Sequence, residues 1–490
     1  MTWFRFFFFV FTFLLLFIIN PLLSQDLFYE QVVRIDAKDK PDEIIKKAAH
    51  LIPSRRQAEW QETEFAVFVH FGMNTFTNRE WGEKGTVPAL FNPSALDARQ
   101  WATTAKKAGA KLLILVAKHH DGFCLWPSKF TEYSVKNSPW KKGKGDVVAE
   151  VAEACRDAGI KLGIYISPWD LNSPIYGTDA YNVYFKQQLT ELLSNYGPID
   201  EVWFDGACGE GPNGKRQLYD WSGYYHIIRT LQPDAVISVM GPDVRWVGTE
   251  SGYGRETEWS VVPLSASAKD KNARQPQQKE IRNDTFVPPG NMMEQDLGSR
   301  EKILNASILI WYPSEVDVSI RPGWFYHPEE DCLVKSPQKL VDIWYSSVGR
   351  NSSLLLNIPP DKRGLIHEHD VTALEEMKKI LDSTFNTDLT EKAEETKNDS
   401  LVLLDLPEAV VFDRILLQEN FRNGQRVELF SLEIWNEEKW VEVFRGTTIG
   451  YMRLLQIDPV KTSRVRLRII ESRDLAQIRS FKLFKAPSDN

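Results

Sequence analysis

The sequence predicts an α/β protein of two domains, a (β/α)8-like barrel followed by a C-terminal antiparallel β-sandwich. From about Glu64, short apolar runs alternate with amphipathic helical stretches, which is typical of parallel strands joined by crossover helices. This alternation continues for about 300 residues, a length that suits a closed eight-stranded barrel better than an open sheet. From Leu401 the helical period disappears and short alternating runs remain, as in an antiparallel sandwich.

Each expected element of the barrel is a short apolar run or a helical stretch with apolar residues three and four positions apart. Strands are expected over residues 65–71, 111–117, 161–166, 201–204, 235–239, 316–320 and 354–358. Helices are expected over residues 96–108, 146–158, 181–196, 221–231, 337–348 and 370–382. One strand has no assigned position, because residues 262–300 are polar and contain Pro288-Pro289-Gly290, which favours a long loop.

The second domain is predicted from a change of pattern after the barrel. Residues 391–400 are highly charged, as in a linker. Short strands are expected beyond them, over residues 409–417, 427–435, 439–444, 452–457, 465–470 and 478–484. We therefore predict a barrel domain over residues 25–385, expected to be catalytic, then a linker over 386–400 and a β-sandwich over 401–490.

The first residues are expected to be an export signal. Arg5 precedes an apolar run over residues 6–19, and Asn20-Pro21 ends it. Roughly fourteen residues are too few to span a bilayer but fit the hydrophobic region of a secretory signal. We expect residues 1–24 to be a signal peptide cleaved after Ser24, with an uncleaved anchor as the alternative. The mature chain is then periplasmic or secreted, without stable membrane insertion.

Composition and charge limit the classes of partner. A net charge of -8 gives no electrostatic reason to expect nucleic acid. The 16 Trp, 15 Tyr and 27 Phe residues give mild support to a carbohydrate site, because aromatic faces stack on sugar rings. The four cysteines are scattered and show no metal-like pairing, so neither a disulfide nor a zinc site is predicted. No cofactor and no oligomeric state are predicted.

The first candidate for chemistry is Asp205. The apolar run over residues 201–204 is expected to be a buried strand, and it ends directly on Asp205-Gly206. Burying an unpaired charge costs several kcal/mol, so a core strand gains nothing from such an ending unless the carboxylate faces a polar site. In parallel barrels the carboxyl ends of the strands form that site. The alternative is an ordinary Asp-Gly turn.

Three histidines follow the first two expected strands. His70 lies at the end of the first, and His119 and His120 follow the second directly. Tyr165 and Trp169 lie at or beyond the end of the third. A single histidine at a strand end is more often structural, but three on one face of a barrel favour a site. Metal binding is the weaker alternative, because no Asp or Glu spacing completes a recognised metal motif.

Neutral imidazoles beside aromatic rings suit a polyhydroxylated ligand, since ring nitrogens bind hydroxyls and indoles pack against a sugar face. Hydrolysis of a glycosidic bond then needs two carboxyl groups flanking it. Asp205 is one candidate, and a loop beyond the next strands offers Glu250, Glu256 and Glu258 for the other. Spacing alone does not separate these three, and each could equally be a solvated loop carboxylate.

Several motifs together resemble family 29 of the glycoside hydrolases, the retaining α-L-fucosidases. In order, they are His70-Phe71-Gly72, Glu80-Trp81-Gly82, Lys118-His119-His120-Asp121-Gly122-Phe123, Gly163-Ile164-Tyr165-Ile166-Ser167, Val202-Trp203-Phe204-Asp205-Gly206, Gly241-Pro242-Asp243-Val244-Arg245-Trp246 and Leu355-Leu356-Asn357-Ile358-Pro359-Pro360. The resemblance covers nearly the whole mature chain. Any one motif is weak, but seven in the right order are specific.

The resemblance implies a role for each matching residue. Asp205 matches the nucleophile, and Glu250 best matches the acid/base of the subgroup that acts on α-1,3- and α-1,4-linked fucose, with Glu258 as runner-up. The fucose-binding residues carry over to His70, Glu80, Trp81, His119, His120 and Tyr165. Trp324 is expected to supply an apolar wall for the methyl group of the sugar. The implied substrates are fucosylated oligosaccharides or glycoconjugates.

Two other functions stay open at this point. The chain could be a non-catalytic carbohydrate-binding protein on a hydrolase scaffold, although the presence of both carboxylates argues against it. It could also be an exo-glycosidase for another galactose-configured sugar, since such a sugar shares the axial 4-hydroxyl group with fucose.

Overall fold

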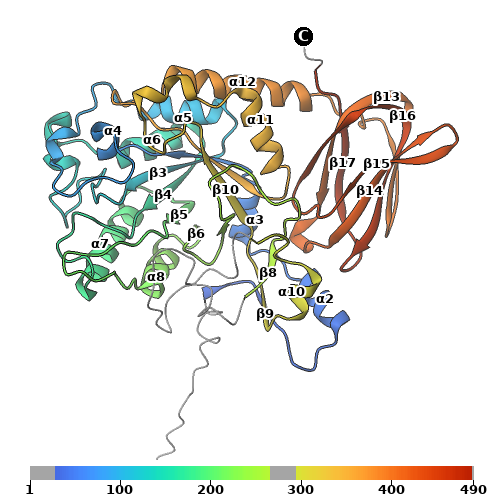
Figure 1. The fold of residues 1–490 in the computed structure, drawn as a ribbon, viewed down its shortest axis with the longest axis horizontal. Helices are drawn as coiled ribbons and strands as arrows, with labels where there is room; N and C mark the ends of the chain where they lie inside the picture. Colours follow the sequence, from blue (N-terminus) through green and yellow to red (C-terminus); the bar gives the residue numbers. More distant parts are fainter. Residues whose placement is uncertain (1–27, 265–293, 488–490) are drawn as a thin grey trace, which may run out of the picture.

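The computed structural model describes residues 28–264 and 294–487, which form a parallel barrel and a separate antiparallel sheet domain (Figure 1). The expected signal peptide over residues 1–24 lies outside the described residues, as does most of the expected loop over 262–300. Within the described ranges, no helix is both long and apolar enough to cross a membrane.

Eight parallel strands form the barrel, as predicted. They are β2 (Phe65–Val69), β3 (Leu112–Lys118), β4 (Lys161–Ile166), β5 (Glu201–Phe204), β6 (Val236–Val239), β7 (Arg245–Trp246), β10 (Ser314–Ser319) and β11 (Ser353–Asn357). Their order around the sheet is β6-β5-β4-β3-β2-β11-β10-β7. Between β6 and β7 a single bridge, from Ser238 to Val244, takes the place of a ladder. The barrel is therefore nearly closed.

Helices cover the outside of the strands (Figure 1). They are α5 (Ala98–Lys107), α6 (Val147–Ala158), α7 (Asp179–Asn195), α8 (Trp221–Leu231), α11 (Pro337–Ser346) and α12 (Glu368–Phe385). Local chemistry sets several of their ends. The carboxylate of Asp97 accepts from two backbone amides at the start of α5, and Asp146 does the same from Ala149 at the start of α6. Gly159 ends α6 in the left-handed region, at φ 67°.

The barrel strand without an assigned position is β7, which lies before the region in which it was sought. It contains only Arg245 and Trp246, and no helix separates it from β6. Two residues carry no periodicity, which is why the pattern missed it. A small antiparallel sheet was also not predicted, and it pairs β1 (Val32–Arg34) and β8 (Val261–Pro263) with opposite edges of β9 (Ile308–Trp311). Short helices complete this part of the chain: α2 (Pro41–Ala49), α3 (Arg55–Gln61), α4 (Met73–Thr77) and α10 (Arg300–Leu304).

The C-terminal domain is one antiparallel sheet. Its strands are β12 (Glu394–Asn398), β13 (Leu401–Glu419), β14 (Val427–Asn436), β15 (Lys439–Gly446), β16 (Arg453–Ser472) and β17 (Ile478–Phe484). The stretch 386–400, expected to be a linker, thus contains β12, which pairs with β13. The two strands expected over 452–457 and 465–470 are the ends of one long strand, β16. Register shifts interrupt β13, and residues from both of its halves enter one hydrophobic core.

The barrel interior mixes aromatic rings with buried acids. Phe68, Tyr165 and Trp203 pack there, with ring centroids 5.3–5.7 Å apart. Glu201 and Glu315 lie in the same layer, where Trp60 Nε1 donates to the first and Trp203 Nε1 to the second, each over 2.7 Å. Burial raises the pKa of both carboxyl groups. The floor of the barrel is therefore held by hydrogen bonds from indole N–H groups to two buried carboxyl groups whose pKa values are raised.

The packing of α5 gives a first prediction. Trp101 is fully buried, and its indole N–H donates to the carbonyl of Gly364 over 2.9 Å. We expect Trp101→Ala to lower the free energy of unfolding by about 3–5 kcal/mol, because it leaves a cavity. Trp101→Phe keeps most of the volume and loses one hydrogen bond, so its cost should be about 1 kcal/mol. Urea unfolding of both variants tests this, and equal losses would contradict it.

Candidate active site

Asp205 follows β5 directly and lies among hydrogen-bond donors. Its Oδ1 accepts from the backbone N–H of Ala207 over 2.6 Å, and its Oδ2 accepts from the Tyr165 hydroxyl over 3.2 Å. His120 Nε2 is 3.8 Å from the same Oδ2. The side chain keeps 27% exposure. These contacts supply donors to a carboxylate that a ligand can still reach, in agreement with the expected polar site at the end of this strand.

His70 is fixed by Asn357, at the end of β11. Asn357 Oδ1 lies 2.8 Å from His70 Nδ1, while its amide nitrogen donates to Ser319 and to the carbonyl of Trp324. The amide oxygen is thus the acceptor, so His70 carries its proton on Nδ1 and has a free acceptor at Nε2. Burial lowers the pKa of His70 to about 3. The imidazole is therefore neutral at neutral pH.

His119 and His120 join this cluster. The ring centroids of His119 and His120 are 4.1 Å apart, and His119 and His70 are 5.7 Å apart. Ser167 holds His120 at Nδ1 over 2.7 Å, and Asn74 lies 3.3 Å from His119 Nδ1. Burial lowers the pKa of both rings. The structure therefore brings the three predicted histidines together as neutral groups.

Trp81 offers an open aromatic face beside these rings. Its indole stacks on His120 at a centroid distance of 5.2 Å and lies 6.1 Å from Trp169. The residue is 56% exposed, which is unusual for tryptophan. The next residue, Gly82, has φ 81°, and a Cβ there would lie 2.5 Å from that of Asp121. Only glycine fits this turn, which holds Trp81 over the histidines.

Glu80 binds the segment that carries Trp324. Its carboxylate accepts from the backbone N–H of Trp324 over 2.9 Å and of Phe325 over 3.1 Å, and His327 Nε2 is 2.6 Å away. Trp324 in turn lies over His70, with ring centroids 5.2 Å apart. Glu80, expected to bind sugar, therefore also orients the wall of the site.

Glu250 lies in the loop after β7 and faces Trp324. The indole N–H of Trp324 donates to Glu250 Oε2 over 3.1 Å. Partial desolvation raises the pKa of Glu250, although the residue stays exposed to solvent; the negative charges of Asp205 and Glu80 raise the pKa further, and the Trp324 hydrogen bond lowers it. A carboxyl group that keeps its proton longer than usual is suited to donate it.

The Glu250 loop is attached to β10 at both ends. The backbone N–H of Val247 donates to Glu315 over 2.9 Å, and that of Gly252 to Asp317 over 3.2 Å, each to the carbonyl oxygen. The Asp317 side chain accepts from Trp246 Nε1 over 2.8 Å. Burial raises the pKa of Asp317 to about 8, with the charges of Glu250 and Asp205 as further causes. Asp317 is thus a buried acid close to the two more accessible carboxyl groups of Asp205 and Glu250.

The other two candidate glutamates lie at the interface with the C-terminal domain. Glu258 is 1% exposed and pairs with Arg245 and, over 3.3 Å, with Arg255. Glu256 pairs with Arg453 and Arg350. None of these ion pairs involves Tyr165, Ala207 or His120, the residues that contact Asp205. The geometry favours Glu250 over Glu258 as the partner of Asp205.

Residues that orient the site were missed by sequence reasoning. They are Asn74, Ser167, His327, Asp317 and Asn357. The signal available for Ser167, Asp317 and Asn357 is a polar side chain in or just after an apolar strand, the same one that identified Asp205. Asn74 lies in the short helix α4 and His327 in a loop, and a polar residue in either place carries no such signal.

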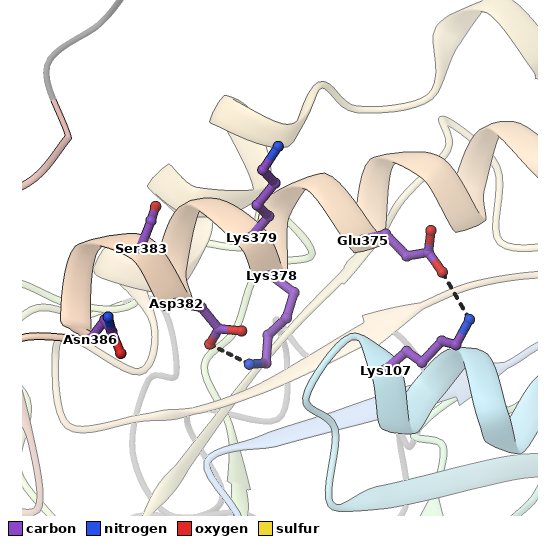
Figure 2. A pocket seen from close by; sticks show the side chains of 7 residues that line it. All are labelled: Lys107, Glu375, Lys378, Lys379, Asp382, Ser383 and Asn386. Carbon is purple, nitrogen blue, oxygen red and sulfur yellow. Dashed lines mark hydrogen bonds and ion pairs between the residues drawn. The ribbon is translucent and has the colours of Figure 1, made fainter.

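A surface hollow of 510 Å³ lies elsewhere, between the end of α5 and the second half of α12 (Figure 2). Lys107 pairs with Glu375 over 3.2 Å, and Lys378 pairs with Asp382. Because α5 ends there just before β3 begins, the hollow is at the amino ends of the barrel strands, away from Asp205. These two ion pairs are exposed to solvent. Among the residues described, no group of three or more His, Cys, Asp or Glu side chains could hold a metal ion.

The lowered pKa of His70 predicts a pH dependence of stability. Its ordinary pKa is 6.5 and its pKa in the fold is about 3, so between these values only the unfolded chain takes up the proton. Its contribution is complete above about pH 6.5 and is lost as the pH falls toward 3. When the free energy of unfolding is measured by denaturation at pH 7 and at pH 5, it should fall more between these pH values for the wild type than for His70→Gln. Equal losses would contradict this.

Comparison with known proteins agrees with this geometry. The family model for alpha-L-fucosidase matches residues 34–384. Alpha-L-fucosidase 1 of Arabidopsis thaliana is 40% identical over 459 residues, which cover 86% of this chain and 83% of the relative.

Solved structures show the same relationship. The crystal structure of a glycoside hydrolase 29 family member from an unknown rumen bacterium is 40% identical, with a TM-score of 0.78, and the match covers 90% of this chain and 78% of that one. A glycoside hydrolase family 29 fucosidase of Ruminococcus gnavus in complex with fucose is 28% identical, with a TM-score of 0.74, and the match covers 89% of this chain and 95% of that one. The chain therefore belongs to the α-L-fucosidase family, family 29 of the glycoside hydrolases.

Proposed function

We propose that this α-L-fucosidase is a retaining exo-enzyme that releases terminal α-1,3- or α-1,4-linked L-fucose by double displacement, with Asp205 as nucleophile and Glu250 as acid/base. The observation that carries the proposal is the contrast between the two carboxyl groups. Asp205 has hydrogen-bond donors at both oxygens, whereas partial desolvation and nearby negative charge raise the pKa of Glu250. Two acids with opposed environments divide the roles of nucleophile and proton donor.

In the first step, an Asp205 oxygen attacks the anomeric carbon of fucose as the bond to the leaving oxygen breaks. That oxygen takes the proton of Glu250, and a covalent fucosyl ester forms on Asp205. In the second step, the Glu250 carboxylate takes a proton from water, and the resulting hydroxide oxygen attacks the same carbon. The ester bond breaks, and Asp205 leaves as a carboxylate. Two inversions give net retention of configuration.

The neutral imidazoles are the groups that would bind the sugar hydroxyls. His70 offers an acceptor at Nε2, and its low pKa keeps it uncharged. Trp324 lies beside it and can cover the apolar side of the ring and its methyl group. The Ruminococcus gnavus relative was solved with fucose bound, which supports the same sugar here.

The linkage and the location rest on the sequence. The stretch Val247-Gly248-Thr249-Glu250-Ser251-Gly252 resembles the subgroup that acts on α-1,3- and α-1,4-linked fucose. The apolar segment within residues 1–24 supports export to the periplasm or the exterior. Fucosylated glycans in those compartments are the substrates that we propose.

Product analysis with a matched variant tests the proposal. We expect the wild type to release fucose from a Lewis-type trisaccharide and not from 2-linked fucosyllactose, with the α anomer appearing first in NMR spectra. Asp205→Asn removes the nucleophilic charge and should lower turnover by at least about 10³-fold, while fucose binding stays detectable by calorimetry. Full activity in a folded Asp205→Asn protein would overturn the assigned nucleophile. Early release of the β anomer would overturn retention, and release from 2-linked fucosyllactose would overturn the linkage.

The hydrogen bond between Trp324 and Glu250 predicts a pH effect. The indole N–H stabilises the ionised form of Glu250 and so lowers its pKa. Trp324→Phe removes this donor but keeps an aromatic ring, so the pKa of the proton donor should rise. The alkaline limb of the kcat/KM profile, which reports this group in the free enzyme, should therefore move to higher pH. A limb that stays in place or moves to lower pH would contradict Glu250 as the acid.

A further inference from the structure

The segment between β7 and β8 contains both Glu250 and the buried Glu258. The carboxylate of Glu258 binds two arginines that flank the Glu250 loop in the sequence, Arg245 before it and Arg255 after it. All three side chains are at most 3% exposed. Burial lowers the pKa of both guanidinium groups. Two buried cations this close are stable only with the anion between them, so Glu258 keeps this part of the segment together.

The two arginines hold the main chain around the Glu250 loop. Arg255 Nη2 donates to the carbonyl of Val247 over 2.9 Å, three residues before Glu250. Arg245 donates from Nε to the carbonyl of Tyr312 over 2.9 Å and from Nη2 to that of Trp259 over 3.0 Å. The position of the loop start thus depends on where Glu258 holds the Arg255 guanidinium group, while Arg245 ties Glu258 to the main chain of Tyr312 and Trp259.

The C-terminal domain binds the main chain on both sides of the Glu258 side chain. The backbone N–H of Glu258 donates to Thr448 Oγ1 over 3.0 Å, and its carbonyl accepts from Gln425 Nε2 over 2.9 Å. Gln425 Oε1 also accepts from the N–H of Ser260 over 2.8 Å. Thr448 lies between β15 and β16, and Gln425 lies between β13 and β14.

We propose that Glu258 is a positioning residue for the acid/base, and that the C-terminal domain sets the position of Glu250 through it. The path runs from Thr448 and Gln425 to Glu258, then through Arg255 to the carbonyl of Val247. This inference rests on the proposed role of Glu250. It gives the C-terminal domain a part in the reaction although none of the residues proposed to bind the sugar belongs to that domain.

The inference predicts an effect on proton transfer to the leaving group and little effect on nucleophilic attack by Asp205. A shifted Glu250 loop weakens proton delivery to the leaving oxygen, but Asp205 is held by β5 and Tyr165 and still attacks. Substrates whose leaving group departs without a proton then keep most of their rate. Substrates with a poor leaving group, which needs the proton, react more slowly. A general loss of folded protein would lower the rates for good and poor leaving groups by the same factor. The ratio of these two rates therefore separates a positioning effect from a loss of stability.

The test compares kcat/KM over a series of aryl α-L-fucosides, from 4-nitrophenyl to 4-methoxyphenyl. This parameter reports steps up to formation of the fucosyl ester. The variants are Glu258→Gln, which removes the central charge, and Thr448→Val, which keeps the shape and removes one acceptor. The matched control is Arg422→Met, which breaks a different interdomain contact, the ion pair of Arg422 with Glu62 at the end of α3.

We expect the first two variants to depend more steeply on the leaving group than the wild type, with a loss of about tenfold for the poorest leaving group and little for 4-nitrophenyl. Arg422→Met should keep the wild-type slope at a comparable change in thermal midpoint. If Glu258→Gln does not fold, Thr448→Val alone decides, and a wild-type slope for it would overturn the inference.

Glu250→Ala serves as the reference that separates this inference from the proposed function. Its slope should be the steepest, with roughly 10²-fold loss or more for the poorest leaving group, and azide should restore its turnover on 4-nitrophenyl fucoside. If Glu250→Ala keeps the wild-type slope, the proposed acid/base is overturned. If the leaving-group dependence of Glu250→Ala is steeper than that of the wild type, while Glu258→Gln and Thr448→Val keep the wild-type slope, only the present inference fails.

Discussion

The site depends on one geometric constraint, the convergence of parallel strand ends in a nearly closed barrel. Asp205, Tyr165 and Asn357 come from three different strands, yet each lies in or just after the carboxyl end of its own. Because all eight strands run in the same direction, these ends meet on one face. The hydrogen bonds between Tyr165 and Asp205 and between Asn357 and His70 follow from that shared direction.

Burial then decides the charge of each group, in opposite directions for acids and bases. Removing water disfavours the charged form, so it lowers the pKa of His70 and raises that of Glu250 and Asp317. For the same physical reason the histidines become neutral hydrogen-bonding groups and Glu250 holds its proton more strongly. Asp205 differs because an amide and a hydroxyl donate to its carboxylate.

The C-terminal domain is part of this arrangement and not a separate appendage. Its loops bind the main chain of the segment that begins with β7 and carries Glu250. Arg453 adds a further interdomain contact through Glu256. The segment that carries Glu250 is therefore attached to β10 through Val247 and Gly252, and to the second domain through Glu258 and Ser260.

Residue types and their periodicity by themselves determined the barrel, the antiparallel second domain, and Asp205 with the three histidines, because these depend on local strand and helix patterns. Tertiary structure alone placed β7, which is too short to have a period, and made β12 part of the sheet. It also separated Glu250 from Glu258. These two glutamates lie only eight residues apart, but one faces Trp324 and the other lies between two arginines beside Thr448. Contacts with residues so distant in the chain leave no trace in local spacing, so spacing did not separate the two glutamates and only the folded molecule shows their different surroundings.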